Sequence, residues 1–291
     1  MADMLSLLAA SALVIPSSVR SSMSRSGMNS IRPPMLTNNH WLYKIVITNG
    51  YYKAVAMYLQ WQGGEIMRLR IYDEEISVVI DALDFYSRIW IGQYRNILFE
   101  SRGLKQCDQL DKHEDEIVSR LLFLRRILLP GLEGYGFGGS YGIFSDERDI
   151  RAGIAYDLQQ EIRNKRAYFE HPQGGYTVDF HDPLPCDDDP CPFPRAYCRT
   201  EDGKTALYVD AVDRQVQIIL DSLYVQKAFV AGRFCEMFSF FTDDRPALSI
   251  VDEIEEIYSK ISDRGCVIAL AAQIQNVIDS IESQLDYNDA A

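Results

Sequence analysis

The stretch EISVVIDALDFYSRIWIGQY, residues 75–94, decides the fold expected for this chain. Its apolar residues recur at steps of three and four, as they do on the buried face of an amphipathic helix. The three residues 73–75 are all acidic. Carboxylates in a first helical turn are stabilised by the helix dipole. The spacing therefore predicts a long helix that begins at Asp73 and extends to about Ile97.

The same pattern returns 140 residues later as VQIILDSLYVQKAFVAGRF, residues 216–234. At that offset Asp81 faces Asp221, Leu83 faces Leu223, Gly92 faces Gly232 and Tyr94 faces Phe234. Each copy is predicted to hold a strand and three helices, at 67–72, 73–97, 115–129 and 145–169 and again at 206–210, 216–240, 251–261 and 267–285. A repeated order of elements at one offset indicates an internal duplication. Ser145 or Asp146 is the expected cap of the third helix in the first copy.

The fold class predicted is α+β and mainly helical, with two related strand–helix–helix–helix units. β-branched residues before a turn predict a small N-terminal β hairpin at 43–48 and 54–61. A further short strand is expected at Tyr176–Phe180. The domains predicted are an N-terminal apolar segment and flexible, extended arm, a first α+β unit with the hairpin, a connector, and a second, trimmed helical unit, at 1–40, 41–185, 186–203 and 204–291.

The charge is large, negative and unevenly distributed. The 291 residues carry a formal net charge of -13. Residues 1–66 hold five basic and two acidic residues, a net charge of +3, so the rest carries -16. Such an acidic body repels the phosphates of nucleic acid, so direct binding to DNA or RNA is not expected. No membrane partner is expected either. It fits either a merely soluble surface or one that competes with nucleic acid for a basic groove.

The cysteine content and the N-terminus favour the cytoplasm. Six cysteines are few for this length, so no disulfide scaffold is expected and a reducing compartment fits better. No stretch is apolar for long enough to predict a transmembrane helix. Residues 4–16 have the length of a signal-peptide core, but no Lys or Arg precedes them and Asp3 does. An apolar helix that docks on a partner or on a neighbouring subunit of a homo-oligomer is expected instead.

A glycine-rich loop at 131–142 matches two catalytic patterns. Residues 134–139 fit G-x-G-x-x-G, and residues 138–142, around Ser140, fit G-x-S-x-G. Both patterns require a preceding strand, whereas a helix ended by Pro130 precedes this loop. The sequence therefore favours a flexible or interface loop whose aromatic side chains reach a partner: Tyr135, Phe137 and Tyr141.

The segment after the third helix holds the one cluster with metal-ligand chemistry. Thiolate and imidazole ligands at short spacings could hold a structural zinc, here from His181, Cys186, Cys191 and Cys198. The usual two-residue gap within a Cys pair is missing. The alternative is a solvated turn that exposes Asp187, Asp188 and Asp189, which are also candidates for partner binding. The sequence gives no catalytic residues.

Three stretches resemble a family of small, uncharacterised bacteriophage and prophage proteins. They are EISVVIDALDFYSRIWIGQY (75–94), PGLEGYGFGGSYGI (130–143) and AYDLQQEIRNKRAYFEHPQGGYTVDFHDPLP (155–185). The resemblance covers about residues 67–185. This chain differs from the small members by its N-terminal extension and its second unit. The resemblance implies a phage origin and a host cytoplasmic setting, and it carries over no catalytic residues.

These observations predict a non-enzymatic phage accessory protein that binds and inhibits a host protein complex, of the anti-defence type. The complex could be one that handles nucleic acid. Two alternatives stay open. One is an enzyme acting on a nucleotide or nucleic-acid component, centred on Ser140 or on His181 and Cys186. The other is a virion or assembly protein whose apolar N-terminus docks on a neighbour.

Overall fold

The computed structural model describes residues 66–97, 112–186, 191–201, 203–242, 245–261 and 264–289. All of them belong to the compact unit Val55–Ala291. The predicted N-terminal segment, arm and hairpin, and Asp187, Asp188 and Asp189, lie outside the described residues. No helix among the described residues is both long and apolar enough to cross a membrane.

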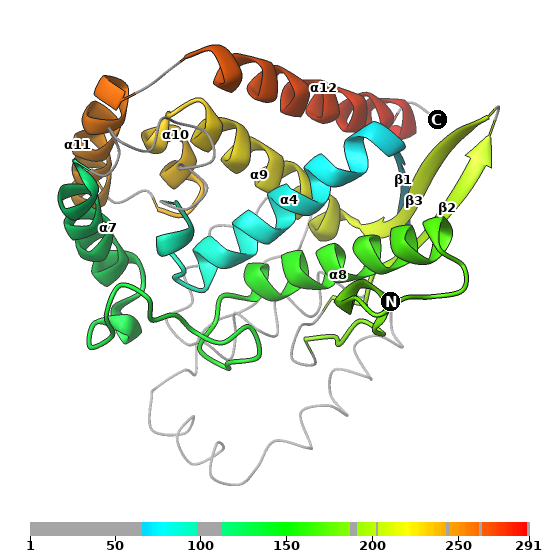
Figure 1. Ribbon diagram of the computed structural model, residues 1–291, viewed down its shortest axis with the longest axis horizontal. Coiled ribbons are helices and arrows are strands. Elements are labelled where there is room, and N and C mark those ends of the chain that lie inside the picture. The colour runs from blue at the N-terminus through cyan, green and yellow to red at the C-terminus, as the bar shows by residue number, and fades with distance from the viewer. Residues whose placement is uncertain are drawn as a thin grey trace, which may run out of the picture. The chain divides into compact units, whose positions relative to one another are not determined.

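The fold is α+β and mainly helical, as predicted (Figure 1). The first copy contains β1 (Ile66–Tyr72), α4 (Asp73–Trp90), α7 (Glu114–Leu128) and α8 (Ile150–Glu170). The second contains β3 (Lys204–Val212), α9 (Asp213–Val230), α11 (Arg245–Ile261) and α12 (Arg264–Asp289). Between and beside these lie η2 (Pro130–Leu132), η3 (Val178–Phe180), β2 (Arg195–Glu201) and α10 (Phe234–Ser239).

The register of the central strand pair follows the 140-residue offset. β1 and β3 are antiparallel, and Leu69 lies opposite Val209, its own counterpart in the second copy. Counting outward, Ile66 pairs with Val212 and Tyr72 pairs with Ala206. An antiparallel pair centred on two equivalent residues has a local twofold axis through that centre. The two copies are thus joined as two subunits of a symmetric dimer would be.

Both copies begin their first helix in the same way. Each strand leads into its helix with no intervening residue, at Asp73 and at Asp213. Glu75 accepts a hydrogen bond from the Tyr72 backbone N–H at 2.8 Å, and Gln215 accepts one from the Val212 N–H at 3.0 Å. A side chain three residues inside the helix thus satisfies an N-terminal N–H group at both sites.

Both copies also end that helix in the same way. Gly92 and Gly232 follow α4 and α9 with φ of 86° and 71°, a left-handed conformation that favours glycine. The predicted helices at 73–97 and 216–240 are therefore each interrupted at this glycine. In the second copy α10 follows the break.

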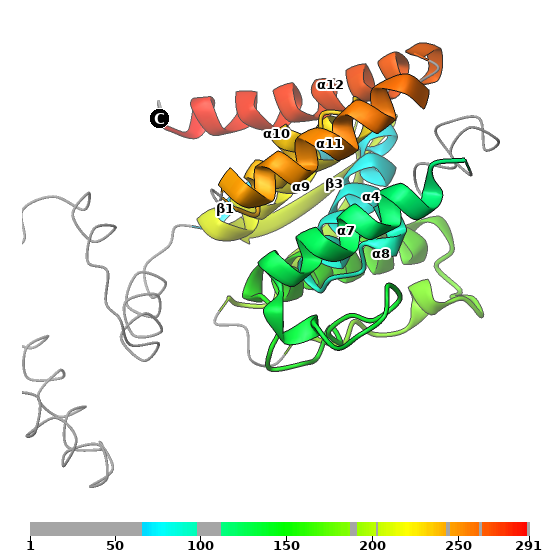
Figure 2. The same ribbon diagram turned by 90° about the vertical axis from the view of Figure 1, so that its left-hand side faces the viewer.

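The core repeats position by position. α4 packs against α9, α8 packs against α4, and α12 packs against α9. Both views show α4 and α9 between α8 and α12 (Figures 1 and 2). α7 packs against α11. The buried positions shared by α4 and α9 are Ile76/Val216, Val78/Ile218, Val79/Ile219, Ala82/Ser222, Leu83/Leu223, Phe85/Val225, Ile89/Phe229 and Trp90/Val230.

The sheet has the order β1-β3-β2, and one of its faces packs on the helices through Leu69, Ile71, Leu207, Val209 and Ala211. A side chain from each third helix bonds to an outer strand. Gln284 of α12 bonds to both the N–H and the C=O of Arg70, at 2.8 and 2.9 Å. Glu161 of α8 accepts from the N–H of Ala196 at 3.1 Å. Backbone N–H and C=O groups that are hydrogen-bonded in this way are not free to pair with an additional strand.

Three local predictions were wrong. Residues 176–180 form no strand, and η3 lies there instead, because α8 supplies the hydrogen bonds that a neighbouring strand would have supplied. Helix α8 is capped by Asp149, whose carboxylate accepts from the Arg151 N–H at 2.8 Å, and not by Ser145 or Asp146. The predicted connector 186–203 contains β2, which pairs with β3.

The two equivalent glycines provide a matched test of the fold. A Cβ on Gly232 would meet no atom, whereas one on Gly92 would overlap the side chain of Leu132. Gly232→Ala should therefore cost only the left-handed strain, about 1–2 kcal/mol. Gly92→Ala should cost about 3 kcal/mol or more, because strain and overpacking add. Urea unfolding followed by circular dichroism would measure both, and equal costs would contradict this account.

Candidate functional site

A buried arginine organises the glycine loop. The Arg125 side chain of α7 is 1% exposed, and its guanidinium donates to four backbone carbonyls of the loop. The acceptors are Tyr135 at 2.7 Å, Gly136 at 2.9 Å, Phe137 at 3.4 Å and Gly139 at 2.5 Å. Burial lowers the pKa of Arg125. A guanidinium still remains charged at neutral pH, so the loop is wrapped around a cation.

This arrangement has the opposite polarity to a phosphate loop. Loops that bind phosphate direct backbone N–H groups at the anion. Here carbonyl oxygens converge on a cation, and η2 precedes the loop where a strand would be needed. The G-x-G-x-x-G pattern therefore reflects a tight, carbonyl-inward turn. The loop was predicted to be flexible or part of an interface, and Arg125 anchors it from inside.

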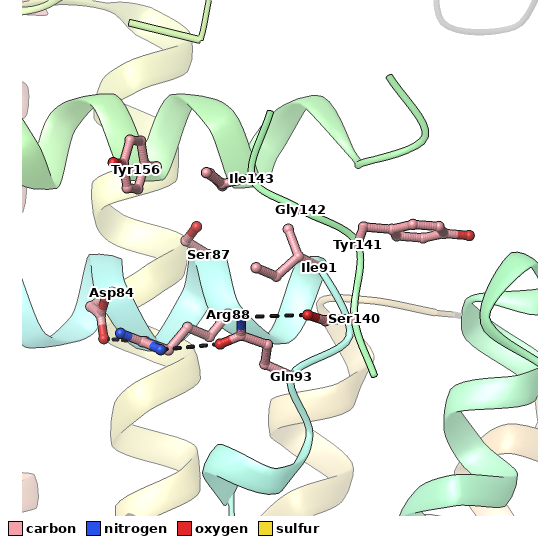
Figure 3. Close-up of a pocket in the computed structure, with 10 residues that line it drawn as sticks. All are labelled: Asp84, Ser87, Arg88, Ile91, Gln93, Ser140, Tyr141, Gly142, Ile143 and Tyr156. Carbon is pink, nitrogen blue, oxygen red and sulfur yellow. Dashed lines mark hydrogen bonds and ion pairs between the residues drawn. The ribbon is translucent and has the colours of Figure 1, made fainter. Parts of the chain in front are cut away.

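An open pocket of about 300 Å³ lies between the end of α4, the glycine loop and α8 (Figure 3). Its polar groups form a chain of contacts. Asp84 pairs with Arg88 at 2.5 Å, Arg88 donates to Gln93 at 3.0 Å, and Gln93 donates to Ser140 at 3.5 Å. The remaining lining residues are Ser87, Ile91, Tyr141, Gly142, Ile143 and Tyr156.

The pocket offers polar contacts without an activated nucleophile. Ser140 accepts from Gln93, and no histidine among the described residues hydrogen-bonds to it. Figure 3 shows the Tyr141 ring directed away from the pocket. Burial raises the pKa of Tyr141 and of Tyr156, so both phenols stay protonated and neutral at physiological pH. The geometry suits a small polar ligand better than acyl transfer, which needs a base beside the serine.

A second loop, residues 171–186, is anchored on α8 by buried polar side chains. Asn164 donates to the carbonyls of Asp179 and His181, each at 2.9 Å. Asp157 accepts from the Cys186 N–H at 3.1 Å. With Glu161, which holds β2, these side chains form a stripe on one helical face at positions 157, 161 and 164. The stripe is buried in addition to the apolar face of α8, which includes Ala155, Leu158 and Ile162.

Most of the large exposed apolar side chains among the described residues lie in or beside these two loops. Tyr176 is fully exposed, and Leu184, Tyr135, Val178 and Phe144 are 55–66% exposed. Tyr168 and Phe169, at the end of α8, are each 40% exposed. Both views place the two loops on the side of α8 that faces away from α12 (Figures 1 and 2). We call Tyr135, Phe144, Tyr176, Val178 and Leu184 the loop surface.

The predicted partner-binding aromatics differ in accessibility. Tyr135 is 59% exposed. Phe137 and Tyr141 are half-buried and pack against the core. The Tyr141 hydroxyl also lies over Gly131. The backbone N–H of Tyr141 donates to the Ile91 carbonyl at 2.9 Å. Tyr135 is therefore the one of the three that is mainly free to contact a partner.

The structure does not gather the predicted metal ligands. Among the described residues, which include His181, Cys186, Cys191 and Cys198, no group of three could hold a metal ion. Cys186 is buried against α8, whereas Cys198 lies on β2. Burial raises the pKa of Cys198 to about 11. It is therefore a protonated thiol at neutral pH.

Comparison with known proteins finds no relative. No protein-family model, curated protein or solved structure matches this chain. The function is therefore argued from the geometry of the chain itself.

Sequence reasoning missed both loop anchors and most of the loop surface. The spacing of Asp157, Glu161 and Asn164 was the available signal, because a polar stripe at helical spacing on a buried helix requires partners. Nothing local marks Arg125, since its acceptors are carbonyls of a loop 10 to 14 residues further on.

Replacement of Arg125 should release the glycine loop. Arg125→Met leaves four loop carbonyls without their donor and should destabilise the protein by about 3 kcal/mol. Amide hydrogen exchange across residues 134–142 should rise more than exchange in α9. Arg126→Met is the matched control, because Arg126 is exposed, and it should change stability by less than about 0.5 kcal/mol. Unchanged exchange in Arg125→Met would refute the anchoring.

Proposed function

We propose that this chain is a bacteriophage accessory protein that binds and inhibits a host protein complex through the loop surface. The phage origin rests on the resemblance of residues 67–185. The observation that carries the binding role is the distribution of exposed apolar side chains. They concentrate in and beside the glycine loop and the loop at 171–186, and the glycine loop has no counterpart in the second copy, where α11 leads almost directly into α12.

Comparison of the two copies distinguishes the elements that build the core from the exposed loop residues. Strands, first helices and core positions recur in both copies and are accounted for by packing. The loop surface has no counterpart and gains nothing for the core, since Tyr176, Val178 and Leu184 remain largely exposed. Exposed apolar patches of this kind commonly mark interaction sites.

The glycine loop and the loop at 171–186 are preorganised for binding a partner. Arg125 and Asn164 anchor them from inside through backbone carbonyls, so their exposed side chains need little further ordering on binding. Preorganisation lowers the entropic cost of association. The acidic body would add charge complementarity to a basic groove, such as that of a complex that handles nucleic acid. Such a protein would act in the host cytoplasm, with anti-defence as its natural role.

The proposal is tested by affinity capture from phage-infected cells at two salt concentrations. The bait is the full chain, and the variant is Tyr176→Ser/Val178→Ser/Leu184→Ser. Recovery of the host partner should fall roughly tenfold or more, because apolar anchors supply most interface energy. Ile268→Ser on α12 is the control, since Ile268 is 66% exposed and lies outside both loops. It should leave recovery unchanged.

Three outcomes would count against the proposal. The first is capture of no host factor together with no protection of phage from any host defence. The second is equal loss in the loop variant and in Ile268→Ser. The third is recovery of the chain in purified virions, which would favour the assembly role. An activity abolished by Ser140→Ala or His181→Ala would instead favour the enzyme.

A further inference from the structure

The sheet face that points away from the helices has an unusual composition for so acidic a chain. Alternation along the strands places on this outer face the residues Arg68, Arg70, Tyr72, Arg195, Tyr197, Arg199, Glu201, Tyr208 and Asp210. Lys204, opposite Glu201, also lies on this face, so four arginines and one lysine accompany two acidic residues, a local excess of three positive charges. The loop surface contributes none of them.

The aromatic side chains of this face include a stacked tyrosine pair, Tyr197 and Tyr208, which we call the tyrosine platform. The rings of Tyr197 and Tyr208 stack across β2 and β3, with centroids 5.3 Å apart and planes inclined by 14°. The Arg68 guanidinium lies 5.5 Å from the Tyr197 ring centre. Arg70 lies 4.9 Å from that of Tyr72 and 5.9 Å from that of Tyr208. Arginine side chains therefore lie beside the tyrosine rings on all three strands.

Ion pairs hold part of the platform in place. Asp210 pairs with Arg68 at 2.6 Å, and Glu201 lies 3.3 Å from Arg70 and 3.5 Å from Arg199. The Tyr208 hydroxyl also donates to Glu201 at 2.7 Å. Arg199 is 62% exposed along its side chain, and Arg195 is exposed, so both can reach an added anion.

We propose that this outer face binds single-stranded nucleic acid. Unstacked bases would stack against the half-exposed rings of Tyr197 and Tyr208, and phosphates would contact Arg195 and Arg199. Sheets that carry exposed aromatic residues between basic ones bind single strands in this way, since every base has a face to stack. The proposal is independent of the loop surface and of the host partner.

Other anionic partners fit this face less well. A duplex buries its base faces and is read by an element that enters a groove, whereas this face is a flat three-stranded sheet. An acidic peptide would use the arginines but leave the tyrosine platform without a planar partner. The charge of the whole chain is not decisive, because charges farther away than about 8 Å are largely screened at physiological salt. The expectation of no direct nucleic-acid contact therefore does not extend to this face.

Fluorescence polarisation of a labelled 20-nucleotide oligothymidylate, titrated with the full chain at 50 and 200 mM KCl, tests the proposal. Arg195→Gln/Arg199→Gln should weaken binding about tenfold or more at the lower salt. It should also reduce the slope of log affinity against log salt by about 1.4, about 0.7 for each lost phosphate contact. Tyr197→Ala should weaken binding roughly tenfold with the slope unchanged, and Tyr197→Phe should restore it.

The matched control is Arg126→Gln/Arg233→Gln, which removes the same charge from exposed positions on α7 and just before α10 and should leave affinity within about twofold. Circular dichroism confirms that each variant is folded. Absence of binding at 50 mM KCl, or equal weakening by the control pair, would overturn the proposal. Displacement of the oligonucleotide by duplex DNA or by polyglutamate as effectively as by unlabelled oligothymidylate would also overturn it, because the face would then bind charge alone.

Discussion

The pairing of β1 with β3 about Leu69 and Val209 is the constraint on which the rest of the structure depends. Each strand passes directly into its helix, so the register of the pair also places α4 and α9. A slip of one residue would turn Leu69 and Ile71 outward and bring Arg68 and Arg70 against the core. Burying those charges without their partners would cost far more than the sheet gains. One strand pair therefore fixes the core and the outer face together.

The doubled scaffold explains where this protein can vary. Helices α4 and α9 share eight buried positions, and the glycine after each helix has a positive φ. Differences collect in the third helices. The buried face of α8 carries Asp157, Glu161 and Asn164, which require backbone partners, and the chain after α8 supplies them. α8 also buries apolar residues such as Leu158 and Ile162, whereas the residues described as buried in α12 are all apolar: Ile274, Val277, Ile278 and Ile281.

The two surfaces proposed to bind differ in chemistry and in origin. The loop surface is apolar, belongs to the first copy alone and is anchored by buried side chains. The outer sheet face is basic and aromatic, and both copies build it, with Arg68 and Arg70 from β1 facing Tyr208 and Asp210 from β3. A chain with both could hold a protein and a single strand at once. This combination fits a target complex that works on nucleic acid.

The sequence by itself determined the periodic elements, because helical spacing and the paired glycines are local signals. The 140-residue offset, α4, α9 and the fold class were all predicted from it. Only the tertiary structure decided the position of β2, the turn at 176–180 and the shape of the glycine loop. RAYCRTE, at 195–201, reads as polar because one face of that strand carries arginines and a tyrosine. The loops depend on Arg125 and Asn164, whose acceptors are carbonyls of other segments. Every residue has a carbonyl, so no residue type marks those partners, and only the folded chain brings them within hydrogen-bonding distance.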